Sequence, residues 1–220
     1  MPELFDEEHA SHYDQSWVRL APLQLALYHL TRELFSAFPG DARVLCVGAG
    51  TGRELLFLAE QFPGWRFTVV EPSAPMLKIC RHKATHLQQR CKFHQGYLDS
   101  LPDTEPFAAA TTILVSHFVE TPQKLPFYKE VARRLQPGGR LVSADLMDYP
   151  ELLDPWFQLM SQGALPPEKL QEQRRYFAQS VHRLDEVAMK SLLQKSGFVE
   201  PRLFYKACLI GGWVAERAEE

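Results

Sequence analysis

The sequence lacks the features that mark several large classes of protein. No uninterrupted apolar segment approaches the ~20 residues that span a bilayer, so no transmembrane helix is expected. The four cysteines form no C-x-x-C pair, which gives no indication of a zinc site or a redox pair. The net charge is only −3, which argues against a broad nucleic-acid surface. The first residues are acidic, unlike a secretory signal, so we expect a cytoplasmic protein.

The composition that remains is that of an ordinary globular protein. The chain has 220 residues, of which 45% are hydrophobic and 23% charged, enough for one domain with a sizeable core. No internal repeat or low-complexity linker divides it. We therefore expect one domain over residues 1–220, and we make no prediction about its oligomeric state.

The most informative segment is a glycine-rich stretch that follows an apolar run. Residues 44–47 are apolar and lead into Gly48-Ala49-Gly50-Thr51-Gly52, while a second apolar run, 67–70, ends at Glu71. A strand, a glycine turn, a helix and an acid after the next strand are typical of a nucleoside site on a parallel sheet. A dinucleotide loop would need a third glycine at position 53, where Arg53 stands, so a nicotinamide cofactor is disfavoured.

The apolar periodicity predicts alternating strands and helices. Strands are expected near 43–47, 66–70, 91–95, 111–116, 140–146, 200–207 and 208–216. Helices are expected over 16–38, after Gly52, after the helix-capping Ser73, over 123–135 and over 184–195, with one or two more within 150–180. The helix after Gly52 is expected to expose Arg53 and Glu54, and Cys208 is expected in a strand. This order predicts an α/β fold with a parallel, doubly wound sheet and a C-terminal antiparallel hairpin at one edge.

Four motifs together resemble the class I S-adenosylmethionine (SAM) dependent methyltransferases. They are residues 44–52, the segment 70–77 around Glu71, the loop 96–102, and the Leu-Gln-Pro-Gly-Gly turn at 135–139. The resemblance implies a Rossmann-like, seven-stranded sheet, mostly parallel with an antiparallel edge strand. It also implies that the protein binds SAM, with S-adenosylhomocysteine (SAH) as product, and that a set of cofactor-binding residues follows from the motifs. These are Gly48, Ala49, Gly50, Gly52, Glu71, Pro72, Met76, Tyr97, Leu98, Asp99 and Ser116.

The resemblance also assigns roles and shows two departures. Glu71 would accept hydrogen bonds from the ribose hydroxyls, Met76 would pack on the adenine, and the Leu98 backbone N–H would meet the adenine edge. The family usually has an acid where this chain has Cys46, and often an aspartate where it has Tyr97. Both losses keep open a SAM-binding partner protein without catalysis.

The acceptor side is less defined by sequence. A SAM methyltransferase mainly positions its acceptor, and a base is needed only for weak nucleophiles. His117 is the candidate catalytic base, ahead of His182 and Glu120. An amino-terminal helical lid of about 1–39 and a helical insertion of about 147–182 would cover the acceptor. The candidate substrate residues in these segments are Tyr13, Tyr149, Trp156, Arg174, Arg175 and Tyr176.

The leading hypothesis is methyl transfer to a small organic acceptor, with no direct contact to nucleic acid. A second likeness keeps another outcome open. Phe5-Asp6-Glu7, Gln173-Arg174-Arg175 and residues 203–215 resemble carboxy-S-adenosylmethionine synthase, an enzyme of tRNA wobble modification. A carboxylated cofactor rather than a methylated product would distinguish that enzyme.

Overall fold

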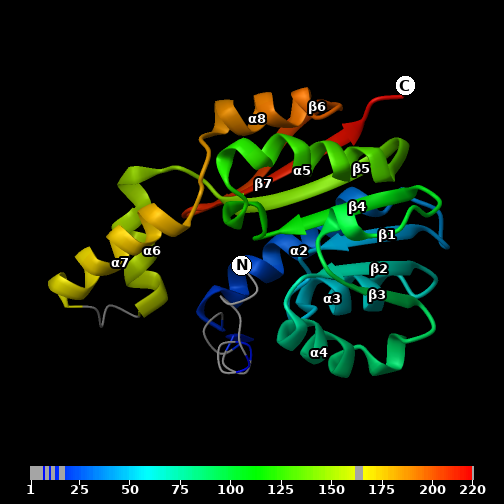
Figure 1. The fold of residues 1–220 in the computed structure, drawn as a ribbon, viewed down its shortest axis with the longest axis horizontal. Coiled ribbons are helices and arrows are strands. Elements are labelled where there is room, and N and C mark those ends of the chain that lie inside the picture. The colour runs from blue at the N-terminus through cyan, green and yellow to red at the C-terminus, as the bar shows by residue number, and fades with distance from the viewer. Residues whose placement is uncertain (1–6, 8–9, 11–12, 15–17, 162–165, 220) are drawn as a thin grey trace.

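The sheet is the organising element of the protein. The computed structural model describes residues 7, 10, 13–14, 18–161 and 166–219. Seven strands form one sheet in the order β3-β2-β1-β4-β5-β7-β6 (Figure 1). Their bounds are β1 Arg43–Val47, β2 Arg66–Glu71, β3 Cys91–Gln95, β4 Phe107–Ile113, β5 Leu135–Leu146, β6 Phe198–Ala207 and β7 Ile210–Arg217.

Strand order reverses between β1 and β4, and this reversal places the functional site. The strands β3, β2, β1, β4 and β5 pair in parallel, whereas β7 is antiparallel to both β5 and β6. The antiparallel strand therefore lies one position in from the edge strand β6. In a doubly wound sheet, ligands bind beyond the carboxyl ends of the strands at the point of reversal, here β1 and β4.

Helices cover both faces of the sheet. The main helices are α2 Ala21–Phe35, α3 Arg53–Gln61, α4 Ala74–Lys83, α5 Thr121–Arg134 and α8 Glu186–Lys195. Helix α2 packs against α3, and α5 packs against α8. Because the strand order runs in opposite directions from β1 and from β4, right-handed crossovers place these two helix pairs on opposite faces of the sheet. Short 3-10 turns complete the order, namely η2 Val18–Leu20, η3 Thr85–Leu87, η4 Leu98–Ser100, η5 Ser116–Phe118 and η6 Pro150–Leu152.

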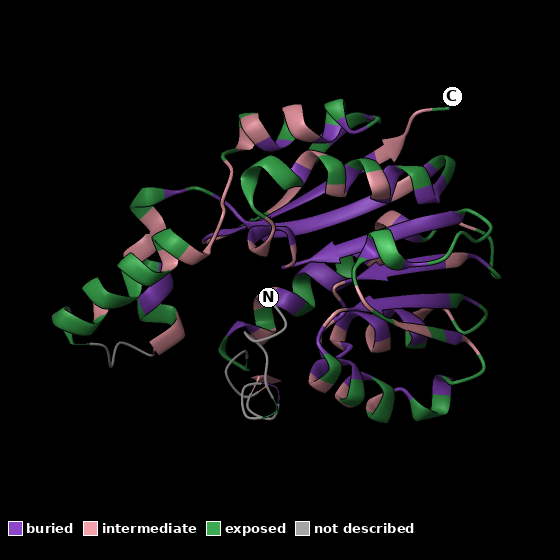
Figure 2. Cartoon of the chain, viewed as in Figure 1, coloured by how far each residue is buried: buried purple, intermediate pink, exposed green. Residues whose placement is uncertain are grey.

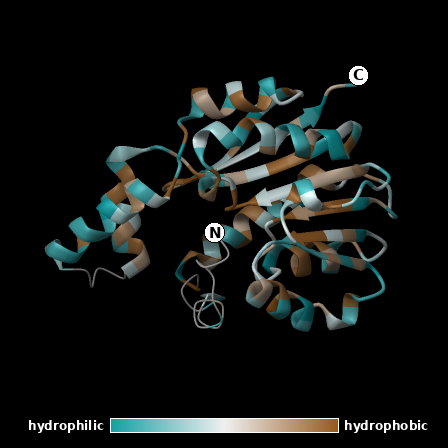
Figure 3. Cartoon of the chain, viewed as in Figure 1, coloured by the Kyte–Doolittle hydropathy of each residue, from teal (hydrophilic) through white to brown (hydrophobic). Residues whose placement is uncertain are grey.

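The core follows from burial of the sheet on both faces. All seven residues of β4 are buried, as expected for a central parallel strand (Figure 2). The central strands are also the most apolar part of the chain, and the exposed faces of the helices are hydrophilic (Figure 3). Among the described residues, none of the helices is both long enough and apolar enough to cross a membrane.

A helical arm extends beyond the carboxyl ends of the parallel strands. It consists of α6 Leu153–Ser161 and α7 Pro167–Ser180, which contact each other (Figure 1). Trp156 and Phe157 of α6 are buried, but α7 has no buried residue among those whose burial is described. The arm occupies most of the segment expected to be one or two helices.

The structure corrects several expected boundaries. The strand expected at 111–116 spans Phe107–Ile113, because Leu114 turns the chain with a φ of 58° and Ser116 begins a 3-10 turn. Strand β5 begins at Leu135 rather than residue 140, and α2 spans 21–35 rather than 16–38. Cys208, expected in a strand, lies in the turn between β6 and β7 with a φ of 51°.

Candidate functional site

A cavity of about 550 Å³ opens at the carboxyl ends of the parallel strands. This volume is within the range of small-molecule and cofactor sites. It brings together residues from four loops that are far apart in sequence. The sequence-predicted residues on its wall are Tyr13, Gly48, Gly50, Glu71, Pro72, Met76, Tyr97, Leu98, Asp99 and Glu120.

Glu71 is the best-defined polar group on the cavity wall. It is the last residue of β2 and only 6% exposed. The Gly50 N–H donates to its Oε2 at 2.8 Å, and the Ser73 N–H donates to its Oε1 at 2.9 Å. Burial raises the pKa of Glu71, and these two backbone donors act in the opposite direction. Each carboxylate oxygen still has a lone pair available to a ligand in the cavity.

The glycine loop keeps side chains out of the cavity. Gly48 and Gly50 have φ angles of 66° and 54°, in the left-handed region that favours glycine. A Cβ at Gly48 would lie 2.5 Å from Val115 Cγ2. At Gly50 a Cβ would meet no atom closer than Met76 Cε at 3.9 Å, so a side chain there would occupy open space beside Glu71. The glycines therefore leave space beside the loop that a side chain would occupy.

The next two loops supply one apolar face and one polar rim. Ser73 caps α4 by accepting from the Met76 N–H at 3.4 Å, which holds the buried Met76 at the cavity. Leu98 is buried in η4, whereas Tyr97 is 48% exposed. Asp99 is exposed and lines the rim.

Residues 13 and 14 lie over the glycine loop. Asp14 accepts a hydrogen bond from Thr51 Oγ1 at 2.7 Å and also pairs with Lys83 at the end of α4. Tyr13 lines the cavity, and burial followed by the nearby Glu71 carboxylate raises the pKa of its hydroxyl. This short segment therefore closes one side of the cavity.

A buried polar network lies behind the wall, next to η5. Asp145, at the end of β5, pairs through Oδ1 with His117 Nδ1 at 2.5 Å and accepts from the His117 N–H at 2.9 Å. It also accepts from Ser116 Oγ, and Lys124 Nζ donates to the Ser116 carbonyl. Ser116 and His117 are both buried and are absent from the cavity wall, although Val115 and Phe118 beside them line it. The His182 N–H donates to the His117 carbonyl at 2.9 Å.

Glu54, in the first turn of α3, is buried, although it is expected from the sequence to be exposed. It is only 5% exposed, and Thr111 Oγ1 of β4 donates to its Oε1 at 2.7 Å. Burial raises the pKa of this carboxyl to about 8, although the Thr111 hydrogen bond acts to lower it. The buried carboxyl is therefore protonated at neutral pH.

We expect the Glu54→Gln variant to lose pH dependence of stability. A folded-state pKa of about 8, above the ordinary 4.5, means that folding retains a proton that the unfolded chain releases between these pH values. The free energy of unfolding of the wild type should thus fall by up to about 1.4 kcal/mol per pH unit as pH rises through this window. Urea unfolding at successive pH values measures the difference from Glu54→Gln. Glu60→Gln, an exposed change on the same helix, is the control; a wild-type profile parallel to Glu54→Gln contradicts the prediction.

The remaining predicted residues lie away from the cavity wall. Tyr149 is buried and donates to Glu186 at 2.6 Å, and Trp156 is buried in α6. Arg174 pairs with Asp154 on the exposed face of the arm, and Arg175 and Tyr176 are also exposed there. Ala49 and Gly52 belong to the glycine loop but do not line the cavity.

Sequence reasoning missed one side of the cavity. Helix α5 and the turn before it contribute Val115, Phe118, Val119, Gln123, Phe127 and Glu130. Their positions after β4 were the available signal, since β4 is the strand at which the order reverses. Among the described residues, no three histidine, cysteine or carboxylate side chains are grouped to hold a metal ion.

Comparisons with known proteins give one consistent picture. Residues 44–139 match a family model described as "Methyltransferase domain". The chain is 30% identical over 184 residues to the fatty-acid O-methyltransferase of Mycolicibacterium smegmatis, covering 79% of this chain and 65% of that one. It is 25% identical over 151 residues to the carboxy-S-adenosyl-L-methionine synthase of Campylobacter lari, covering 67% and 63%. The chain thus spans less than two thirds of these two curated relatives.

A solved structure agrees in fold. The SAH-bound form of CalO1, a methyltransferase in calicheamicin biosynthesis, superposes with a TM-score of 0.63 at 18% identity, covering 88% of this chain and 54% of that one. At this identity the likeness shows the fold alone. The glycine loop and Glu71 at the end of β2 lie in the region that the family model matches, and the sheet built on this region has the strand order 3-2-1-4-5-7-6. Residues 44–139 therefore match a methyltransferase domain, and the sheet built on them has the class I SAM-dependent methyltransferase fold.

Proposed function

We propose that this protein transfers a methyl group from SAM to a small organic acceptor. The observation that carries the proposal is Glu71, a buried carboxylate held by two backbone N–H groups beside an open glycine cradle. When bound, SAM supplies a methyl group on a positively charged sulfonium. Among the described residues, the charged groups that line the cavity are all carboxylates, namely Glu71, Asp99, Glu120 and Glu130, and they favour a cationic ligand.

The residues of the chain would divide the cofactor between them. Glu71 would accept from the ribose hydroxyls, and the backbone at Gly48 and Gly50 would approach the ribose and methionine parts. Met76 and Leu98 would pack against or border the adenine. This division needs no side chain from Cys46, which is fully buried in β1.

The acceptor would bind on the side of the cavity that Tyr13 and Leu114 line. We propose that catalysis there is mainly positioning. His117 is buried on Asp145 and would act as a positioning residue through the wall residues beside it, not as a base in contact with the acceptor. The segment 1–39, of which Tyr13 lines the cavity, would shield this side from water, whereas no described residue of 147–182 lines the cavity.

Two relatives bear on the substrate. One is named for O-methylation of a fatty acid, which supports a small organic acceptor for this chain. The other is named a carboxy-SAM synthase, but the two arginines of that likeness, Arg174 and Arg175, are exposed on the arm and do not line the cavity. Phe5 and Asp6 of the same likeness lie outside the described residues. Carboxyl transfer is therefore the less supported alternative.

Ligand-dependent stabilisation tests the proposal. SAM or SAH at ~100 times its dissociation constant should add about 2.7 kcal/mol to the free energy of unfolding, seen as a rise in Tm, and NAD should add nothing. Mass spectrometry of reactions with a panel of small acceptors then identifies a methylated product. Absence of stabilisation by both SAM and SAH would overturn the proposal. Stabilisation without product from any acceptor would instead support the non-catalytic SAM-binding protein, and a carboxylated cofactor would support the synthase.

A further inference from the structure

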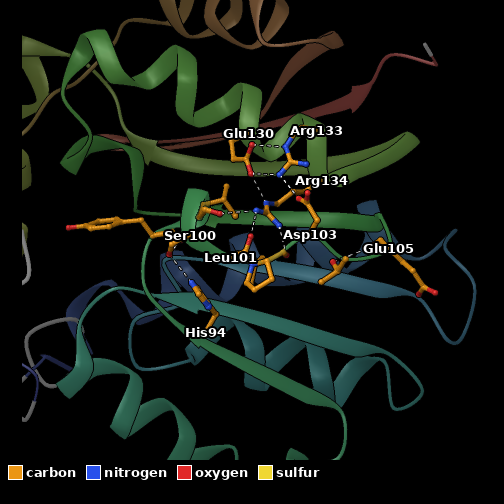
Figure 4. Close-up of polar contacts among 12 residues, drawn as sticks. His94, Ser100, Leu101, Asp103, Glu105, Glu130, Arg133 and Arg134 are labelled. Carbon is orange, nitrogen blue, oxygen red and sulfur yellow. Dashed lines mark hydrogen bonds and ion pairs between the residues drawn. The ribbon is translucent and has the colours of Figure 1, made fainter.

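Arg134 joins α5 to the loop that borders one end of the cavity. It is the last residue of α5 and only 5% exposed. Its Nη2 donates to the carbonyls of Leu98 at 3.1 Å and Leu101 at 2.6 Å, and its Nη1 donates to the Pro102 carbonyl at 3.2 Å (Figure 4). One buried guanidinium thus holds three carbonyls of the segment 98–102, hereafter the 98–102 loop.

A carboxylate on the cavity wall orients this guanidinium. Glu130 Oε1 accepts from Arg134 Nε at 2.8 Å, and Arg133 donates to both oxygens of Glu130 at 2.8 Å (Figure 4). Arg133 also pairs with Asp103, just beyond the loop, at 2.8 Å. Because Glu130 lines the cavity and fixes Arg134, the loop and the α5 side of the cavity are mechanically linked.

The hydrogen bonds of Arg134 also fix the direction of the loop's peptide groups. The C=O and the following N–H of a trans peptide point in opposite directions. Arg134 holds the Leu98 carbonyl, and the Ser100 N–H and Ser100 Oγ hold the Tyr97 carbonyl at 3.1 and 2.7 Å. Both peptide groups that flank Leu98, including its own N–H, are thus fixed where Tyr97, Leu98 and Asp99 line the cavity. The opposite side of the loop is braced by His94 Nε2, which lies 2.9 Å from Ser100 Oγ.

We propose that Arg134 is the positioning residue for nucleobase recognition, holding the backbone of the 98–102 loop in the conformation that reads the adenine edge of the cofactor. This inference rests on the proposed function, because it needs the adenine to lie at that loop. In the family, an aspartate often stands at the position of Tyr97 and would help to bind the adenine. In this chain, Arg134 of α5 would support that binding instead. A preorganised backbone binds more tightly, since the cost of ordering the loop is met during folding.

The test compares Arg134→Lys with Arg133→Lys as a matched control. Arg133 also pairs with Glu130 but donates to none of the three loop carbonyls. Calorimetry gives the Kd for SAH and for S-inosylhomocysteine, in which the adenine amine is replaced by a carbonyl oxygen. Arg134→Lys loses the guanidinium that donates to the three loop carbonyls, so the variant should bind SAH about tenfold more weakly than the wild type. The Kd ratio between the two nucleosides should also fall towards one. Arg133→Lys should stay within about twofold on both measures.

The ratio separates positioning from a merely structural role. General destabilisation would weaken both nucleosides alike and leave the ratio unchanged. If Arg134→Lys does not fold, Glu130→Gln keeps the arginine but weakens its orientation, and it should move the ratio in the same direction by less. A folded Arg134→Lys, or a Glu130→Gln, that keeps the wild-type ratio overturns the inference alone. A wild type that binds neither SAH nor SAM overturns the proposed function as well.

Discussion

Replacing Glu71 with alanine should lower the affinity for SAM and SAH about 100-fold, the largest effect on binding that we expect from a single residue. The ribose hydroxyls would lose the two charge-assisted hydrogen bonds that they donate to the Glu71 carboxylate. The same change leaves the N–H groups of Gly50 and Ser73 without their acceptor, so the loop that approaches the ligand also loses its anchor. Calorimetric titration with SAH, which is not consumed, measures the effect directly.

Glu120→Ala is the matched control for Glu71→Ala. Glu120 is another carboxylate on the cavity wall, but it is exposed at the start of α5. Its removal should change the affinity for SAH by less than about threefold, as expected for an exposed charge. The Tm of each variant without ligand shows that both are folded. Binding by folded Glu71→Ala within threefold of wild type would show that the ribose hydroxyls lie elsewhere.

The fold could be predicted largely from local patterns. Apolar runs ending in Gly48–Gly52 and at Glu71 specify strands and turns through residues close in sequence, and β1, β2 and β3 lie at or within one residue of their expected positions. The central strand was harder. Phe107 is followed by three alanines, which are poor strand formers, and they are in β4 because β1 and β5 pair on both sides of them. The β-branched run at 111–116 drew the prediction too far towards the C-terminus.

The site was predictable where it depends on strand ends and not where it depends on packing between distant elements. Glu54 was expected to be exposed because carboxylates usually are, and its burial requires Thr111, which is 57 residues away and has no local signal at position 54. The α5 side of the cavity likewise depends on contact between α5 and the 98–102 loop. Such contacts follow from the crossover of the chain rather than from the periodicity of either segment.

Asp145→Ala should lower the free energy of unfolding by about 3–5 kcal/mol, because several buried donors lose their acceptor at about 1–3 kcal/mol each. Asp145 is 4% exposed and accepts from the backbone N–H groups of His117 and Leu146, from His117 Nδ1 and from Ser116 Oγ. Burial alone would raise the pKa of Asp145, but the paired His117 and the Ser116 hydroxyl hold it below its ordinary value. Alanine leaves all four donors buried without this acceptor.

Lys124 adds to this cost. Burial lowers the pKa of its amine to about 8, with Asp145 opposing the shift. Removing Asp145 takes away the negative charge that favours the protonated form of the buried Lys124 amine, whose hydrogen bond to the Ser116 carbonyl remains. Urea unfolding at pH 7 measures the loss. Asp148→Ala provides the control, because Asp148 is an exposed carboxylate in an ion pair with Arg183 at 3.3 Å, and its removal should cost less than about 1 kcal/mol.

The comparison of Asp145→Ala with Asp145→Asn then decides what the network does. Asparagine keeps the size and one acceptor oxygen, so its cost should be about 1–3 kcal/mol. If the network only holds the wall formed by Val115 and Phe118, Asp145→Asn should catalyse methyl transfer at the wild-type rate when SAM is saturating. Any loss of activity at lower SAM concentrations should then match its loss of affinity for SAM. A folded Asp145→Asn that binds SAM normally but has lost turnover would contradict the positioning role and assign His117, oriented by Asp145, to the chemical step. An Asp145→Ala variant as stable as Asp148→Ala would show that other groups stabilise Lys124 and the buried donors when Asp145 is absent.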